Sequence, residues 1–237
     1  MLRTLILSLM LIVTTAFAGA RSDMDANADH NILTPTAETM NKGELTFNSY
    51  ELVLAGISYG VTDEFQLTFT TLLPLVKNMP FVGLFTGKYK VMDSGTSAFS
   101  IQPGLLFMAY EGETVGTVNF TAMFDIMLNN DNIVTFSSAV NVPFAENDMM
   151  DGFLMTFTAA INSKMSNHVK IIAELTMAGA YAEGSFHMSD DVMLFNYGVR
   201  FFNKDLAAML SFLRPIVMSG DNPFLMGYPY VTFTAKF

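Results

Sequence analysis

The chain has 237 residues, of which 51% are hydrophobic and 14% are charged, and its formal net charge is −10. A soluble domain normally carries about 25% charged residues, and an acidic chain lacks the basic surface that a nucleic-acid partner needs. After residue 20 no stretch approaches about 18 consecutive apolar residues, which excludes a helical membrane protein.

The first 20 residues have the features of a secretory signal peptide. Arg3 is their one charged residue, Leu5–Val13 is a short, almost wholly apolar core, and cleavage is expected after Ala18 or Ala20. The apolar stretch is too short to span a membrane as a helix. The chain contains no cysteine, so we expect neither a lipoprotein anchor nor a disulfide framework.

Residues 21–43 differ from the rest of the chain because they are polar and acidic. They include Asp25, Asp29 and Glu38, and the Thr34-Pro35-Thr36 stretch favours an extended backbone. We expect this segment to be a tail that precedes the folded domain.

From residue 44 to the C-terminus, apolar and polar residues alternate in segments that are separated by turn signals. Successive side chains of a strand point to opposite faces, so each segment has an apolar face and a polar one. The expected strands are 44–51, 53–61, 65–73, 81–92, 97–110, 115–128, 133–143, 152–163, 169–182, 192–202, 206–217 and 227–237.

Segment 115–128 is the clearest of the twelve. Phe120 and Phe124 fall on its apolar face, and Asn119 and Asp125 fall on its polar face. Most segments reach the 9–11 residues that a tilted strand needs to cross a bilayer. A spanning sheet has to close on itself, because a lipid-exposed edge would leave backbone N–H and C=O groups without partners.

The connections between these segments alternate between tight turns and longer, acidic or Gly/Pro-rich loops. Short periplasmic turns and longer extracellular loops are typical of an outer-membrane barrel, and both termini then lie in the periplasm. The first hairpin is the weak point, because its turn near Tyr50–Leu52 lacks Gly and Asn. The sequence therefore predicts twelve strands, with ten as the alternative.

The last strand carries a resemblance to a known class. Val231, Phe233, Ala235 and Phe237 share one face, and Phe237 ends the chain. This pattern resembles the terminal strand of Gram-negative outer-membrane β-barrels, whose final aromatic residue serves as an assembly signal. The resemblance implies an all-β, antiparallel, up-and-down transmembrane barrel over residues 44–237. It also implies three partners: outer-membrane lipid, lipopolysaccharide and the barrel-assembly machinery.

In such a barrel, residues 21–43 would be a periplasmic N-terminal tail, and the sequence leaves open whether this tail folds inward as a partial plug. Lys42-Gly43-Glu44 and Ile57–Asp63 resemble poorly characterised barrel families of Gram-negative bacteria, and this resemblance implies a role related to transport. The leading hypothesis is a passive pore or transporter for small solutes, and the alternative is a structural or surface-interaction barrel with a filled interior.

The polar faces predict the residues that line the lumen. Basic side chains outnumber acidic ones in this predicted lumen, which favours either an internal ion-pair network or a passage for anionic or amphipathic solutes. The candidate solute-binding residues are Lys88, Lys90, Gln102, Asn119, Asp125, Asn141, Lys170, Glu174, Asn196, Arg200 and Lys236. Asn162 falls on the same face.

One motif bears on catalysis. His187-Met188-Ser189 resembles the His-x-Ser pair of outer-membrane lipid hydrolases, in which the His can activate the Ser hydroxyl. The other motifs of those enzymes are missing, so we expect no enzyme activity and keep a lipid hydrolase at the barrel rim as a third hypothesis. His30, His168 and His187 lack metal-ligand spacing, and we expect neither a metal nor another cofactor.

Overall fold

The structure is a computed structural model that describes residues 25–73, 79–110, 113–145, 148–149, 152–182, 184–217 and 226–237. The predicted signal peptide lies outside the described residues, and so does most of the connection between the predicted strands 206–217 and 227–237.

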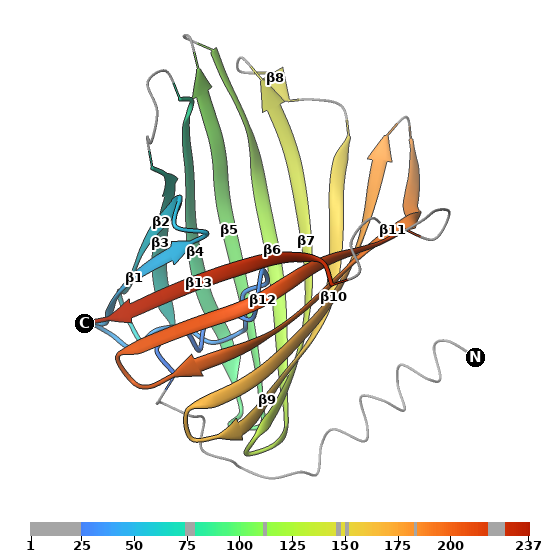
Figure 1. Ribbon diagram of the computed structural model, residues 1–237. Helices are drawn as coiled ribbons and strands as arrows, with labels where there is room; N and C mark the ends of the chain where they lie inside the picture. Colours follow the sequence, from blue (N-terminus) through green and yellow to red (C-terminus); the bar gives the residue numbers. More distant parts are fainter. Residues whose placement is uncertain are drawn as a thin grey trace.

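The described strands form one antiparallel sheet that closes into a barrel (Figure 1). β1 pairs with β13, and β6 pairs with β7, so the twelve strands other than β8 form a closed ring. The two-residue strand β8 pairs antiparallel with the end of β7. The strands are β1 Leu45–Tyr50, β2 Leu54–Gly60, β3 Phe65–Leu72, β4 Phe81–Asp93, β5 Ser97–Tyr110, β6 Glu113–Asn129, β7 Asn132–Ala145, β8 Asp148–Met149, β9 Phe153–Ser166, β10 Val169–Ala182, β11 Ser185–Phe202, β12 Leu206–Val217 and β13 Tyr228–Lys236.

The prediction of a closed twelve-stranded barrel is confirmed, and the ten-stranded alternative is wrong. The first hairpin is real, because Leu45 pairs with Tyr59 and Tyr50 pairs with Leu54. Three residues, Glu51–Val53, connect the two strands, and the Val53 N–H donates to the Tyr50 carbonyl oxygen. Glu51 and Leu52 are therefore the central residues of a β-turn, and their φ values are 52° and 60°. Positive φ at both central positions is typical of a type I′ turn, and here non-glycine residues adopt it.

This turn yields a stability prediction. Leu52 is 78% exposed, and an L-residue in the left-handed region costs about 1–2 kcal/mol. We expect Leu52→Gly to stabilise the barrel by about 1 kcal/mol, as a higher urea midpoint for unfolding in lipid vesicles. The opposite change, Gly95→Leu, acts at a glycine with φ of 81° in the β4–β5 turn and should lower the midpoint. A lower midpoint for Leu52→Gly would contradict the prediction.

One predicted boundary is wrong. The acidic stretch 183–191 was expected to be a loop, but β11 begins at Ser185 and runs through it. The reason is a register shift between Met177 and Gly179 of β10, beyond which Gly179 pairs with Met188. An irregularity of this kind absorbs extra residues within a strand pair, so β11 keeps pairing where alternation in the sequence breaks down.

The two faces of the wall follow the predicted alternation. Apolar side chains such as Phe47, Ile57 and Phe120 lie exposed on the outer face, while polar side chains such as Asn48 and Ser58 are buried inside. The hydrophobic surface is therefore on the outside, where a bilayer would cover it. None of the described residues forms a helix with the length and apolar character needed to cross a membrane.

Candidate functional site

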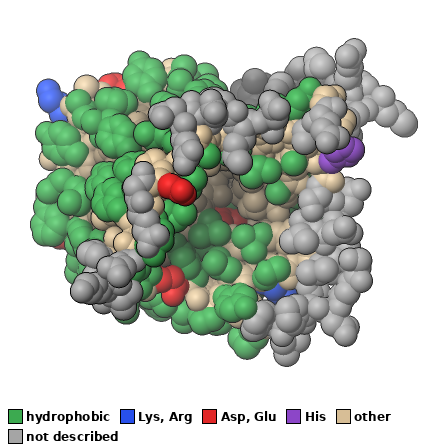
Figure 2. Space-filling model, turned by 90° about the horizontal axis from the view of Figure 1, so that it is seen from above, with side chains coloured by type: hydrophobic (Ala, Val, Ile, Leu, Met, Phe, Trp, Pro, Cys, Tyr) green, Lys and Arg blue, Asp and Glu red, His purple; other side chains and the backbone are tan. Residues whose placement is uncertain are grey.

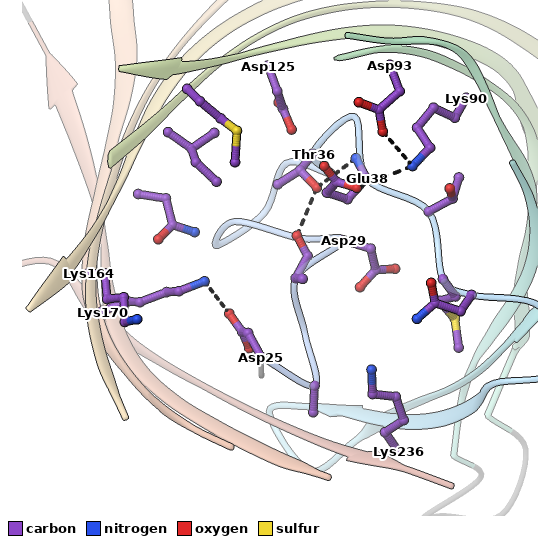
Figure 3. Close-up of a pocket in the computed structure, with 18 of the residues that line it drawn as sticks. Asp25, Asp29, Thr36, Glu38, Lys90, Asp93, Asp125, Lys164, Lys170 and Lys236 are labelled. Carbon is purple, nitrogen blue, oxygen red and sulfur yellow. Dashed lines mark hydrogen bonds and ion pairs between the residues drawn. The ribbon is translucent and has the colours of Figure 1, made fainter. Parts of the chain in front are cut away.

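The most distinctive feature of the lumen is a segment of the chain, residues 25–43, here called the plug, which lies inside it and ends with the exposed residues 41–43 at its mouth (Figures 1 and 3). The Ala26 N–H donates to the Asn203 carbonyl oxygen in the β11–β12 turn, and the Gly43 N–H donates to the Gly60 carbonyl oxygen at the end of β2. Between these points the chain folds back through an antiparallel bridge between His30 and Pro35. Both ends of the plug thus leave the lumen at the short-turn end of the barrel.

Arg200 on β11 is the central contact between the wall and the plug. Its side chain is fully buried, and its guanidinium nitrogens donate to the carbonyl oxygens of Asn27, His30 and Asn31 and to the Asp25 carboxylate. These plug carbonyls point towards the wall, and Arg200 supplies the donors that buried carbonyl groups need. One side chain therefore holds both the beginning and the tip of the plug.

Asp25 is held by two cations from adjacent strands. Its Oδ2 atom lies 2.8 Å from Lys170 Nζ and 3.2 Å from Arg200 Nη1. Burial by itself would raise the pKa of Asp25, but the charges of Arg200 and Lys170 outweigh that effect and lower its pKa below the ordinary value. Asp25 is therefore ionised at neutral pH, and the ion pair is intact there.

Glu174 on β10 holds the tip of the plug. Its carboxylate accepts hydrogen bonds from the backbone N–H groups of Ile32 at 2.7 Å, Leu33 at 3.1 Å and Thr34 at 3.2 Å. It also accepts a hydrogen bond from the Asn196 amide. Hydrogen bonds to an ionised acceptor are stronger than neutral ones, so Glu174 fixes the deepest part of the segment.

Further polar contacts hold the returning half of the plug. The Ala37 N–H donates to Asp125 Oδ2 at 3.0 Å, and Lys88 Nζ donates to the carbonyl oxygens of Asp29 and Glu38 at 3.0 and 2.8 Å. Gln66 accepts from the Met40 N–H and donates to the Asp29 carboxylate. Side chains of β3, β4 and β6 therefore contribute to the binding of the plug.

Apolar contacts complete the interface. Ile32 packs against Ile172 and Met209, with Leu213 and Tyr230 beside them. A second cluster joins Ala37 of the plug to Ala98 and Met123 of the wall. Burial of these side chains adds a non-directional attraction of about 25 cal/mol per Å² of apolar surface.

At the short-turn end, the plug and the wall enclose a cavity of about 220 Å³ (Figure 3). Seven carboxylates and four lysines line it, and the lysines that face them are paired: Lys170 with Asp25, Lys90 with Glu38 and Asp93, and Lys236 with Glu44. The passage is therefore narrow and charged at this end.

The other half of the lumen is more open and more apolar. Leu106 and Met108 on β5 and Leu154 on β9 lie an even number of residues from the buried positions of their strands, so their side chains also face the lumen. They are nevertheless exposed, Leu154 by 54%. Leu33, at the tip of the plug, is 42% exposed. The view from above in Figure 2 shows the barrel hollowed at this end. The plug thus fills one half of the barrel and leaves a wider chamber in the other.

The structure brings together six of the predicted lumen residues around the plug: Lys88, Asp125, Lys170, Glu174, Asn196 and Arg200. Lys90 and Lys236 lie at the short-turn mouth, with Asn162 lining the same cavity. Gln102, Asn119 and Asn141 lie apart from this cluster, and Asn119 and Asn141 are cross-strand neighbours. That any of these residues binds a solute remains a prediction.

The sequence analysis did not identify the residues of the plug that these side chains bind. Asp25, Asp29 and Ile32 were assigned to a tail, and the open question of whether the tail folds inward is answered by their burial in the lumen. A signal was present, because an acidic segment preceded a barrel whose predicted interior had more bases than acids. Wall residues Gln66 and Ser100 also contact the plug and were not among the candidates.

His187 lies on β11 and its Nε2 atom is 2.8 Å from the Ser185 hydroxyl oxygen. The side chain of Ser189 lies outside the described part of the chain. The absence of enzyme activity and the rim-hydrolase hypothesis both stay as predictions.

No protein-family model matches this sequence, and neither does any curated protein. Solved structures do resemble the fold. The COG4313 outer membrane channel from Pseudomonas putida F1 has a TM-score of 0.55 and 10% identity, over 85% of this chain and 98% of that chain. A bacterial polysaccharide outer membrane secretin has a TM-score of 0.50 and 13% identity, over 84% and 77%. The KdgM porin has a TM-score of 0.49 and 10% identity, over 82% and 98%. The chain spans 62% of the length of a loop-deletion mutant of OmpT from Vibrio cholerae.

At these identities the comparisons establish the fold. Together with the closed sheet and its apolar exterior, they identify the chain as a β-barrel of the bacterial outer-membrane type. Short turns face the periplasm in such barrels, so the plug lies in the periplasmic half of the lumen.

Proposed function

We propose that this barrel is a passive channel for small solutes and that the plug closes it until the plug is displaced. The observation that carries the proposal is the division of the lumen into an open half and a half that residues 25–43 fill. A side-chain network belonging to the wall would have sealed the barrel permanently. A separate chain segment held by non-covalent contacts can leave and return.

The fit between plug and wall supports a removable plug. Within the described residues, four buried polar atoms at the tip have no hydrogen-bond partner: Asn31 Nδ2, Asn31 Oδ1, Asn196 Oδ1 and Arg200 Nε. A buried polar group without a partner costs about 1–3 kcal/mol. These unpaired atoms offset part of the free energy that the contacts of the plug contribute, which favours a plug that can be released.

A structural barrel with a filled interior is the second candidate function. The extensive burial of Arg200, Glu174 and the plug favours it, because such an interior stiffens the wall whether or not anything passes. The two functions differ in one measurable property, which is whether the barrel conducts once the plug is free to move.

A disulfide that locks the plug tests the proposal. Ala37 of the plug and Ala98 of β5 are both buried and in contact, and the chain has no native cysteine. We expect an Ala37→Cys/Ala98→Cys variant in planar bilayers to be silent when oxidised and to show conductance steps when reduced, because only the reduced protein can release the plug. Ala37→Cys alone is the matched control, and oxidation should leave its conductance unchanged.

Two results would contradict the proposal. Equal conductance of the oxidised and reduced double variant would mean that ions bypass the plug, so that the plug does not close the channel. A folded barrel that stays silent in the reduced state, with and without solute, would favour the filled structural barrel.

We also propose that the terminal strand serves assembly, with the barrel-assembly machinery as partner, and that the outer face contacts lipid and lipopolysaccharide. Phe237 follows β13 directly and its side chain is exposed. β13 pairs with β1, so its docking is the step that closes the ring.

A further inference from the structure

The wall behind the plug carries two cations at one position. Lys170 on β10 and Arg200 on β11 are directly opposite each other in the strand register. Both bind the same atom, Asp25 Oδ2, and both side chains are buried. The carboxylate that neutralises them belongs to the plug and leaves with it.

An apolar patch lies next to these cations on the same wall. Ile172 and Met209, flanked by Leu213 and Tyr230, surround Ile32 of the plug. Ile172 is two residues beyond Lys170 along β10, which corresponds to about 7 Å. The plug thus presents a carboxylate and an aliphatic side chain to a wall that matches both.

Glu174 sets the far limit of this surface. It is four residues beyond Lys170 on β10, about 13 Å away, and it is buried with a hydrogen bond from Asn196. A ligand with one negative end would therefore place that end at Lys170 and Arg200, because Glu174 repels it at the other end.

An open barrel needs a replacement for Asp25. Without it, two like charges face each other across the β10–β11 register, and an anion that pairs with both would relieve their repulsion. We infer that Lys170, Arg200 and the Ile172–Met209 patch form a binding site for a small organic anion with an apolar body, which the plug occupies in the closed barrel. The inference rests on the proposed displacement of the plug.

The site also determines how the ligand affects the plug. An anion that binds only when Asp25 has left shifts the equilibrium towards the open barrel, in proportion to its concentration above its dissociation constant. The solute would therefore promote its own passage.

The test follows the plug directly, without measuring transport. A Leu33→Cys variant of the full chain carries its only thiol at the exposed tip of the plug, and a spin label there reports whether the tip is held or free. In lipid vesicles at constant ionic strength, we expect benzoate to increase the mobile fraction of the label. Acetate, which lacks the apolar body, should act only at about tenfold higher concentration, and benzamide, which lacks the charge, should have no effect.

Variants separate this site from a general effect of salt. Lys170→Met should raise the benzoate concentration needed for half-maximal mobility by about tenfold or more. Lys164→Met is the matched control, because Lys164 faces Lys170 across the β9–β10 register and lines the same cavity. Ile172→Ser should remove the preference for benzoate over acetate. Heat-modifiable migration in SDS gels verifies that each variant forms a folded barrel.

The inference is overturned if benzamide acts like benzoate, if acetate equals benzoate in the parent variant, or if Lys170→Met and Lys164→Met respond alike. It also fails if the label stays immobile in the presence of benzoate although the barrels conduct, a result that is compatible with the proposed channel. Conversely, benzoate could mobilise the plug in barrels that never conduct. That result would contradict the channel and support the binding site.

Discussion

Arg200→Met is expected to open the barrel. The substitution removes four hydrogen bonds to the plug and leaves Asp25 with Lys170 as its one cation among the contacts described. Breaking a buried ion pair by removing one partner typically costs about 3–5 kcal/mol. The population of barrels with a displaced plug should therefore rise by a factor of roughly one hundred or more, since each 1.4 kcal/mol is tenfold.

The expected result is measurable as the open fraction in single-channel recordings and, independently, as mobility of a spin label at residue 33. Lys236→Met is the matched control, because it also removes one lumen cation. Its partner Glu44 lies at the partly exposed mouth, where an ion pair contributes only about 0–1 kcal/mol. If both variants open the barrel to the same extent, net charge in the lumen controls the plug and the contacts of Arg200 do not.

Phe120→Arg is expected to impair insertion and stability of the whole barrel. Phe120 is 47% exposed on the outer face, in the middle of β6, where its cross-strand neighbours are Pro103 and Val140. An arginine that faces lipid near the midplane of a transmembrane barrel costs about 2–4 kcal/mol. We expect a correspondingly lower urea midpoint and a reduced folded fraction in vesicles, both read from heat-modifiable migration.

Leu128→Arg provides the control for depth. Leu128 lies near the end of the same strand and is also exposed, and a charge near the interface costs only about 0–1 kcal/mol. Equal destabilisation by the two substitutions would mean that the outer face of β6 does not cross a bilayer in the way the alternation implies.

The plug also explains the charge balance of the interior. The predicted lumen contained more basic than acidic side chains, which suggested a passage that attracts anions. With the plug in place, Asp25 neutralises Lys170 and Arg200, and carbonyl oxygens of the plug accept from Lys88. The basic excess is thus a property of the wall alone, and it would be exposed only when the plug leaves.

Much of the architecture was predictable because it depends on a local property. Alternation in the 115–128 segment identifies a strand with one lipid face, and the bilayer requires such strands to close. The weak β1–β2 hairpin shows the limit of this reasoning: Glu51 and Leu52 adopt a left-handed turn that their side chains disfavour, so the turn signal was absent although the hairpin is present. The pairing of β1 with β13, which is distant in the sequence, stabilises the hairpin that contains this turn.

The sequence by itself determined the class of protein, the lipid-facing side of the wall and the identity of most lumen residues, whereas the structure decided between twelve and ten strands. Only the tertiary structure decided that residues 25–43 lie inside the barrel and that Arg200 and Glu174 bind them. Asp25 and Arg200 are 175 positions apart, and no periodicity links them. Their contact exists because the closed sheet brings buried cations to the place where the acidic segment can neutralise them, and this match between distant charges cannot be read from either stretch alone.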